Sequence, residues 1–424
     1  MSTVAELLPP ALRRAVSPYT GIVRTLEECL SAAADPPVHR VAVAAGRGLA
    51  QLAGSGGAGM TRAEAAAAAV GEAIERYALS TVPLERIFVA SASELGDEAV
   101  TPERFALFSE RQHAQPGFPF AAFTRTARVP WVDGLVLPHG EHVWVPAELV
   151  FLSDLAVDGE RIGYATSSGA ACAATRDEAL ERGLCELLER DAFMITWANR
   201  LELPLLDWRG DEKVDELDRA LFAPTGLRYS AVDLSVFHRL PSVLGVVRAP
   251  DGYAGALGVG AGTAVSSVRA WWKALVEAFA ARSAGAKLAL RGGGDVVGTF
   301  EDHIRRYAEP RPESMFLDAS VRRSRIADVP RLPGAAPADR VTELCERVEA
   351  AGSNAYAVDV TSTDIRALGL VVMKVVAPEL CALDVVHGAR FLGGRRLYEA
   401  AWRLGLRPEP LRESDVNPHP HPFP

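Results

Sequence analysis

The sequence is poor in cysteine, and this scarcity limits the kinds of site it could build. Its five cysteines are scattered along the chain without any CxxC pair: Cys29, Cys172, Cys185, Cys345 and Cys381. An odd, scattered set predicts neither a disulfide framework nor a zinc site. A reducing cytoplasm suits this cysteine usage best.

Long apolar runs and basic blocks are also missing. The N-terminus has no continuous apolar stretch of the signal-peptide kind, and the most apolar later segment, residues 369–383, is interrupted by Lys374 and Pro378. We therefore expect neither secretion nor a membrane span. Asp and Glu (54) outnumber Lys and Arg (45), and no Lys/Arg block is present to contact phosphates, so nucleic acid is not an expected partner.

The common nucleotide-binding motifs are absent or incomplete. No GxxxxGK[ST] motif occurs, which excludes a Walker-type ATPase. Gly54–Gly59 matches GxGxxG, but the acidic residue required at the tip of a second strand does not follow, so a dinucleotide fold is rejected and the glycines predict a loop. The Gly-rich segment Arg291–Asp295 predicts a flexible turn.

What is present is enough apolar material for a large core, since 49% of the 424 residues are hydrophobic. Segments typical of strands (39–45, 142–152, 241–249) alternate with Ala-rich helical segments (62–79, 176–196, 268–290). This alternation predicts a mixed α/β or α+β fold. No low-complexity linker divides the chain.

The most informative feature is an internal repeat. Residues 61–78, TRAEAAAAAVGEAIERYA, align without a gap onto residues 175–192, TRDEALERGLCELLERDA, and eight of the eighteen positions are identical. Thr61 with Glu64, and Thr175 with Glu178, each match the capping box of a helix start. We therefore expect two related helices.

Both expected helices carry a Glu-x-x-Glu-Arg triplet on one face. The two triplets are Glu72, Glu75, Arg76 and Glu186, Glu189, Arg190. On a single helix such a triplet is more often a solvated, ion-paired face, but two copies in a fixed frame favour a site. Carboxylates brought together from two helices repel one another unless a cation lies between them, so the repeat predicts Mg²⁺ bound to a triphosphate.

A third, weaker copy of the repeat begins at Ser266. In this copy Ser266, Ala270 and Glu277 fall at the positions of Thr61, Ala65 and Glu72, and Arg282 follows. Three related helices indicate an internally duplicated scaffold.

The last seven residues, Pro418–Pro424, alternate proline with histidine or phenylalanine. Proline fixes φ, so this tail is typical of a stiff polyproline II rod. One interpretation is a disordered terminus. The other is a rod that docks and places its α-carboxylate, or the imidazole of His419 or His421, as a general base. The residues alone leave both open.

In combination, these features resemble the YcaO family of ATP-dependent peptide-modifying enzymes. The resemblance rests on the two ExxER helices, Ser167-Ser168-Gly169 before the second, the ALVEAFAAR segment and the terminal PxPxP, and it covers nearly the whole chain from Ser17 onward. It implies an internally duplicated α/β fold with an N-terminal extension (1–16), a catalytic domain (17–416) and a tail that reaches the active site (417–424).

The resemblance also implies cofactors and residue roles. It assigns Mg²⁺ and the ATP phosphates to Glu72, Glu75, Glu186 and Glu189. It adds ATP contacts by Arg76, Ser167, Ser168, Arg190, Glu277 and Arg282, and a catalytic role for Pro420, Pro422 and Pro424. Three positions depart from the family pattern, because Ala68, Ala280 and Ala58 stand where serine, glutamine and lysine are usual.

Family members that end in PxPxP are typically azoline-forming cyclodehydratases. The expected substrate is therefore a ribosomal precursor peptide whose Cys, Ser or Thr residues become thiazolines or oxazolines. In the implied mechanism the side chain attacks the preceding amide carbonyl, and the amide oxygen accepts the γ-phosphoryl group of ATP before phosphate is eliminated. Thioamide or macroamidine formation by the same ATP chemistry, or a non-catalytic scaffold, are the alternatives.

The resemblance also implies partner proteins. A separate ThiF-like protein that binds the leader peptide is expected, because the residues before Ser17 leave no room for such a domain. A flavin dehydrogenase acting downstream and a homodimer are further expectations.

Overall fold

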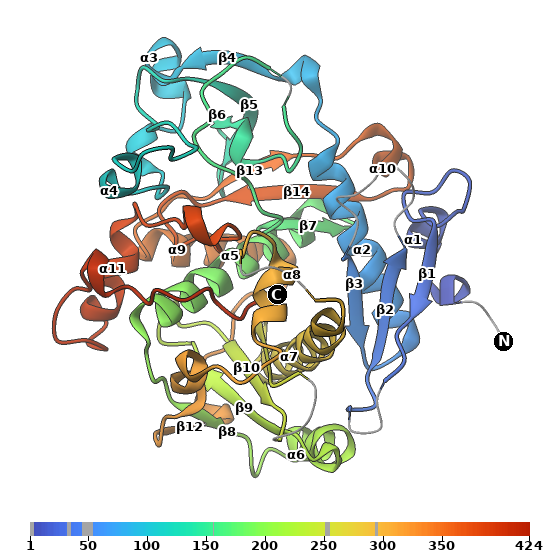
Figure 1. Cartoon of the computed structure of the whole chain (residues 1–424). Helices are drawn as coiled ribbons and strands as arrows, with labels where there is room; N and C mark the ends of the chain where they lie inside the picture. The colour runs from blue at the N-terminus through green and yellow to red at the C-terminus, as the bar shows by residue number, and fades with distance from the viewer. Residues whose placement is uncertain (1–3, 32–34, 45–53, 156, 251–254, 293–295) are drawn as a thin grey trace.

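The structure is a computed structural model that describes residues 4–31, 35–44, 54–155, 157–250, 255–292 and 296–424. Helices and strands alternate throughout this part of the chain, as the mixed class predicted (Figure 1). Residues 293–295 of the expected Gly-rich turn lie outside the described residues. Among the described helices, none combines the length and the apolar character needed to cross a bilayer.

In the described part of the chain, the strands form three sheets. The first has the order β1 (Thr25–Glu28), β2 (His39–Ala44), β3 (Gly56–Gly59). The second has the order β11 (Leu257–Thr263), β10 (Ser242–Arg248), β9 (Arg228–Asp233), β8 (Leu205–Asp207), β12 (Arg323–Arg325). The third has the order β4 (Phe88–Ser91), β5 (Arg128–Val136), β13 (Tyr356–Asp359), β14 (Val371–Val376), β7 (Ala170–Ala173), with β6 (His142–Pro146) also paired to β5.

Each sheet ends in an edge strand that leads directly into a long helix. Strand β3 precedes α2 (Arg62–Ser80), β7 precedes α5 (Arg176–Asn199), and β11 precedes α7 (Ser267–Leu290). The three predicted helices are therefore confirmed within a few residues. The threefold sequence repeat corresponds to three copies of an edge strand followed by a helix.

The helix starts follow the predicted capping chemistry, with one correction. Thr61 and Glu64 form the complete capping box at α2, and the Ser266 hydroxyl caps α7. At α5 the Thr175 hydroxyl accepts the Glu178 N–H, but of the two hydrogen bonds expected there, both between described residues, only this one forms. The capping box predicted for the second helix is thus half formed.

Glycine allows the edge strands to approach their helices closely. A Cβ at Gly57 of β3 would lie 2.3 Å from backbone atoms of α2, and one at Gly260 of β11 would lie 2.5 Å from the Ala278 nitrogen of α7. The loop predicted at Gly54–Gly59 is therefore wrong, because Gly56–Gly59 pairs with β2 as a strand. The glycines serve helix packing.

Shorter helices and apolar clusters complete the framework. These helices are α1 (Pro10–Arg14), α3 (Ala92–Leu95), α4 (Glu110–His113), α6 (Glu212–Leu217), α8 (Phe300–Arg306), α9 (Pro337–Ala350), α10 (Thr363–Ala367) and α11 (Arg395–Arg403). Val4 and Leu8 of the expected N-terminal extension are buried in the same apolar cluster as the inner face of α2.

The proline-rich tail is docked inside the molecule. Its end lies near the centre of the structure, beside α8 (Figure 1). Phe423 is fully buried, and its ring centroid lies 4.7 Å from that of Phe193 on α5. Of the two interpretations of the tail, docking is confirmed and a disordered terminus is wrong, whereas the general-base role stays a prediction.

Candidate nucleotide site

The glutamates of the repeat accept hydrogen bonds from backbone N–H groups at the edges of the three sheets. Glu72 accepts the Gly56 N–H of β3 at 2.9 Å, and Glu277 accepts the Ala261 N–H of β11 at 2.8 Å. Glu186 accepts the Gly169 N–H, just before β7, at 3.2 Å. An edge strand leaves N–H groups unpaired. The first glutamate of each copy accepts a hydrogen bond from one such N–H group, and it lies on the helix that follows this strand in the sequence.

The second glutamates join one copy of the repeat to the next. Glu75 on α2 accepts the Cys172 N–H of β7 at 2.7 Å. Glu189 on α5 accepts the Thr263 N–H of β11 at 2.6 Å. In each case the strand belongs to the following copy, so these two carboxylates hold the three copies around a common centre.

The carboxylates are near enough to repel one another. Burial, together with the charges of Glu186 and Glu72, raises the pKa of Glu75 to about 8. Burial likewise raises the pKa of Glu277 to about 7, with Glu189 adding to the effect. Repulsion between buried carboxylates is relieved by a cation. The structure therefore brings together the glutamates that the sequence singled out.

Two of the three expected arginines lie within these carboxylate groups. Arg76 pairs with Glu72 at 2.8 Å, and Arg190 pairs with Glu186 at 3.2 Å. Arg190 also approaches Glu189 at 3.5 Å, so it contacts both glutamates of its own triplet on α5. Within the described residues its buried Nε has no hydrogen-bond partner. An unsatisfied guanidinium N–H beside carboxylates fits an added anion such as phosphate.

Arg282 has a different setting from the other two arginines. Its buried guanidinium forms an ion pair with Asp35, which also pairs with Arg40 at 3.2 Å. In the helical repeat it lies one position beyond the place that corresponds to Arg76 and Arg190. If Arg282 contacts phosphate as expected, its guanidinium would therefore bind both the phosphate and Asp35.

The Ser167–Ser168 loop is held over the N-terminal half of α5 by a buried lysine. Lys374 of β14 donates to the carbonyl oxygens of Thr166 and Ser168 at 2.7 and 2.5 Å. Its burial lowers its pKa to about 8. Lys374 was not among the residues predicted for the site. The sequence feature that could have identified it is a single lysine inside an otherwise apolar strand.

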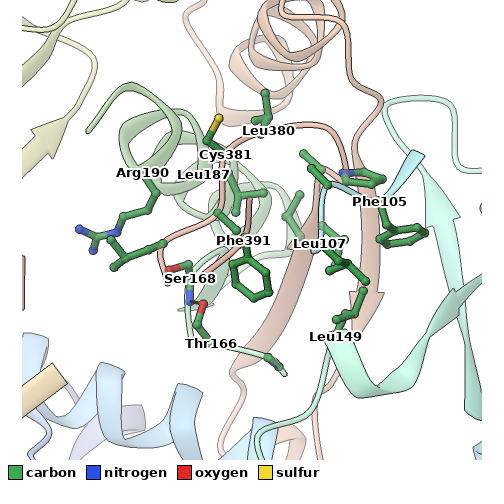
Figure 2. A pocket seen from close by; sticks show the side chains of 18 of the residues that line it. Phe105, Leu107, Leu149, Thr166, Ser168, Leu187, Arg190, Leu380, Cys381 and Phe391 are labelled. Carbon is green, nitrogen blue, oxygen red and sulfur yellow. Dashed lines mark hydrogen bonds between the residues drawn. The ribbon is translucent and has the colours of Figure 1, made fainter. Parts of the chain in front are cut away.

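A cavity of about 90 Å³ opens beside this loop. In Figure 2, Arg190 and Ser168 lie on one side of it and Phe105 and Leu149 on the other. The remaining wall is mostly apolar, with Leu107, Leu187, Leu380 and Phe391. The cavity thus has a cationic, polar side next to the glutamate cluster and an apolar side away from it.

The tail reaches the same arginine from the opposite direction. The Arg190 guanidinium lies 4.1 Å from the centroid of the Phe423 ring, within cation–π distance. His421 is not available as the general base considered above, because its Nδ1 accepts the Phe423 N–H and its Nε2 donates to the Asp384 carbonyl. Burial also lowers its pKa well below the usual value. His419, which is more exposed, remains near Glu313.

The donor set fits a magnesium–triphosphate complex. Each repeat glutamate uses one oxygen for a backbone N–H, which leaves its other oxygen for an arginine or a cation. Hard carboxylate oxygens are ligands that Mg²⁺ prefers, and arginines bind phosphate oxygens. The glutamates would hold the metal, and Arg76 and Arg190 would contact the phosphates.

Comparison with known proteins points to the same cofactors, ATP and Mg²⁺. A family model described as YcaO cyclodehydratase, ATP- and Mg²⁺-binding, matches residues 56–381. An uncharacterized protein of Methanothermobacter thermautotrophicus is 28% identical over 257 residues, which are 59% of this chain and 60% of that protein.

Two solved structures share the fold. A heterocyclase in complex with substrate and cofactor has a TM-score of 0.80 at 24% identity, covering 100% of this chain and 57% of its own. The YcaO protein of Methanopyrus kandleri, bound with AMPPCP and Mg²⁺, has a TM-score of 0.60 at 21% identity, covering 84% of this chain and 86% of its own. The present chain thus spans less than two thirds of that heterocyclase and of the Methanothermobacter protein. Because the family model covers most of the sequence, the chain belongs to the YcaO family, whose members bind ATP and Mg²⁺.

Proposed function

We propose that the chain is an ATP-dependent cyclodehydratase that converts Cys, Ser or Thr residues of a ribosomal precursor peptide into thiazoline or oxazoline rings. The observation that carries this proposal is the position of Arg190. It pairs with Glu186, approaches Glu189, and is covered by Phe423 of the tail. A single side chain therefore links the glutamate cluster to the proline-rich tail.

In this proposal the glutamates bind metal and the arginines bind phosphate. Glu72, Glu75, Glu186 and Glu189 hold Mg²⁺, and Arg76, Arg190, Arg282, Glu277, Ser167 and Ser168 complete the ATP contacts. ATP supplies the γ-phosphoryl group that converts the amide oxygen into a leaving group. The phosphorylated oxygen then departs as phosphate. The chain's own residues orient the reacting groups and neutralise charge.

The peptide substrate would lie between the arginine and the tail. The apolar side of the cavity, with Leu107, Leu187 and Phe391, supports a place for a side chain next to the reacting amide. The tail segment that contains Pro420, Pro422 and Pro424 would face the amide from the other side of Arg190. Lys374 keeps the Ser167–Ser168 loop in place beneath both.

The proposal includes partners of stated kinds. A separate ThiF-like protein would deliver the precursor by its leader peptide, and a flavin dehydrogenase would oxidise the rings afterwards. A homodimer is the proposed assembly of this chain. A heterocyclase with this fold has been solved with its substrate, which supports a peptide-modifying role.

Calorimetric titration with ATP and Mg²⁺ tests the nucleotide site first. We expect Mg²⁺-dependent binding by the wild type and at least a tenfold weaker affinity for Glu75→Gln and for Glu189→Gln, a change of about 1.4 kcal/mol each. Glu178→Gln, about three turns before Glu189 on α5, is the matched control and should bind like the wild type. Loss of affinity in the control alone would contradict the assignment.

The alternative of a non-catalytic scaffold has specific support. Ala68 is exposed one turn before Glu72, and Ala280 is half-buried three residues after Glu277, so two polar side chains usual in the family are missing near the site. No binding at saturating ATP would favour the scaffold. If azoline formation survives deletion of Pro420 to Pro424 unchanged, the tail does not belong to the active site, although the ATP site can still stand. ATP turnover without azoline formation by the intact chain would favour a thioamide- or macroamidine-forming enzyme.

A further inference from the structure

The backbone of the tail offers the rest of the protein mainly carbonyl oxygens. Proline has no N–H, so alternate residues of Pro418–Pro424 cannot donate a hydrogen bond. Three successive carbonyls of the tail accept hydrogen bonds from side chains: His419 from Trp197 at 3.0 Å, Pro420 from Tyr307 at 2.6 Å, and His421 from His303 at 2.7 Å. A docked tail of this composition therefore depends on side-chain donors.

His303 differs from the other two donors because both its ring nitrogens face carbonyl oxygens. Nδ1 lies 2.7 Å from the His421 carbonyl oxygen, and Nε2 lies 2.9 Å from that of Val385. A carbonyl oxygen can only accept a hydrogen bond, so each nitrogen must carry a proton. The ring is fully buried, and a ring that donates from both nitrogens carries a positive charge.

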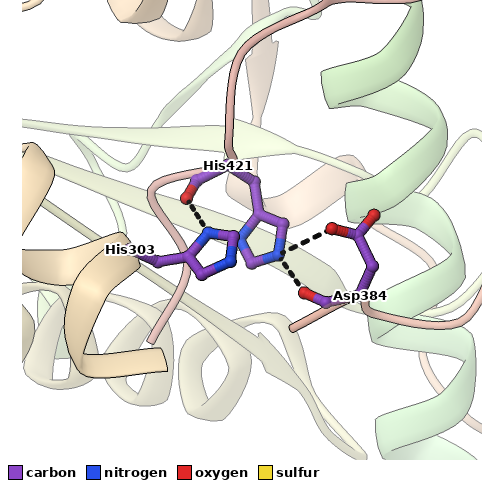
Figure 3. A group of neighbouring side chains, drawn as sticks. All are labelled: His303, Asp384 and His421. Atoms are coloured by element: carbon purple, nitrogen blue, oxygen red, sulfur yellow. Dashed lines mark hydrogen bonds and ion pairs between the residues drawn. The ribbon is translucent and has the colours of Figure 1, made fainter. Parts of the chain in front are cut away.

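The acidic group beside His303 is Asp384, and burial raises the pKa of its carboxyl. The buried Asp384 carboxylate lies beside the ring and also 3.6 Å from Arg390. His421, stacked on His303 with centroids 4.0 Å apart, is neutral, because its Nδ1 accepts and its Nε2 donates. Figure 3 shows His303 pointing at the tail carbonyl and His421 pointing at Asp384.

A metal ion is the competing explanation for two histidines and an aspartate this close together. All four ring nitrogens already take part in hydrogen bonds with protein atoms, and the rings are stacked, with planes 20° apart. Lone pairs from stacked rings do not converge on one ion. The cluster is therefore complete without a metal.

We infer that His303, on α8, is a positioning residue for the tail. Its doubly protonated ring binds the His421 carbonyl of the tail through Nδ1 and the Val385 carbonyl through Nε2, an arrangement called the clamp below. Two residues beyond the clamped His421 carbonyl, Phe423 covers Arg190. The clamp thus sets where the tail meets the proposed phosphate-binding arginine. Its effect on ring formation rests on the proposed function, but its effect on the tail does not.

Two variants of similar size separate the two hydrogen bonds. The amide nitrogen of His303→Asn occupies the place of Nδ1 and still donates to the tail. The amide nitrogen of His303→Gln occupies the place of Nε2 and donates only to Val385. Amide hydrogen exchange of residues 411–424, followed by mass spectrometry, should be at least tenfold faster in the Gln variant and close to wild type in the Asn variant.

The charge of His303 is tested on the wild type, so that a misfolded variant does not decide the matter. With ¹⁵N-labelled histidine at pH 7.5, nuclear magnetic resonance should show one ring with protons on both nitrogens, and this signal should be absent from His303→Asn. A singly protonated His303, or equal exchange rates in the two variants, would overturn the clamp. If the clamp is confirmed while Mg²⁺–ATP binding is absent, the clamp stands and the proposed function fails.

Discussion

The guanidinium of Arg190 lies 4.1 Å from the centroid of the Phe423 ring, although the two residues are 233 positions apart in the sequence. Phe423 is fully buried between this guanidinium and Phe193. The arginine that contacts both glutamates of its own triplet is therefore shielded from solvent by the tail. Shielding strengthens every charge interaction of the arginine, because water no longer screens it.

Shortening Phe423 should destabilise the protein and loosen the tail. We expect Phe423→Ala to lower the free energy of unfolding by about 3 kcal/mol, since a buried aromatic ring is lost. Phe423→Leu keeps most of the apolar volume but removes the ring face beneath Arg190, so its cost should be smaller, about 1 kcal/mol. Urea denaturation measures both values. A cost near zero for Phe423→Leu would show that the ring face contributes nothing.

Two glycine substitutions should have opposite effects. A Cβ at Gly260 would lie 2.5 Å from the Ala278 nitrogen and 2.6 Å from the Glu277 Cβ, so Gly260→Ala must push α7 away from β11 and weaken the Glu277–Ala261 hydrogen bond. We expect a loss of roughly 2 kcal/mol in unfolding free energy.

Gly71 provides the matched control for that substitution. It lies inside α2 next to Glu72, and a Cβ there would meet no described atom within 4 Å. Gly71→Ala should therefore stabilise the protein by about 0.5–1 kcal/mol, because alanine favours the helix. Thermal or urea unfolding measures both variants, and a destabilised Gly71→Ala would contradict the packing described for α2.

Lys374 should give the protein a pH-dependent stability that a Lys374→Met variant lacks. Burial lowers its pKa from 10.5 to about 8, so between these values the unfolded chain binds the proton more strongly than the folded one. The contribution of Lys374 to stability must then rise with pH across this window. From pH 8 to pH 10, the stability of wild type relative to Lys374→Met should increase by roughly 2 kcal/mol. A constant difference would show that the lysine is not buried as a titrating group.

The cysteines should react with thiol reagents in two groups. Burial raises the pKa of Cys172, Cys185 and Cys345 to about 12 and that of Cys381 well above its usual value, whereas Cys29 is half-buried. The thiolate is the reactive form. Under native conditions we expect Ellman's reagent to react readily with one thiol per chain, and with five after unfolding in guanidinium. Rapid reaction of several thiols in the native protein would contradict the described core.

Replacing Asp191 should be costly, because it holds three parts of the chain together. It accepts two hydrogen bonds from Arg396, one from His238 and one from the Cys381 N–H. These bonds outweigh its burial and hold the pKa of Asp191 well below its usual value. Asp191→Asn should lower the unfolding free energy by about 3 kcal/mol, as for a broken buried ion pair. A value under 1 kcal/mol, measured in urea, would contradict this.

Local chemistry explains why part of this protein could be predicted from its sequence. The helix starts at Thr61, Thr175 and Ser266 follow from hydroxyl side chains that cap their own first turn, within four residues. The placement of Glu72 with Arg76 on one face follows from helical spacing alone. The repeat then identified which glutamates belong to one site, because each copy carries the same local pattern.

The long-range contacts could not be predicted, because no local rule selects their partners. That Glu75 reaches the Cys172 N–H depends on the edge of a sheet formed by strands distant in sequence, and the buried Lys374 depends on the loop that it holds. The sequence left the tail open between disorder and docking. Only the tertiary structure decided it, because the tail's carbonyl groups require donors that Trp197, Tyr307 and His303 supply from elsewhere in the chain.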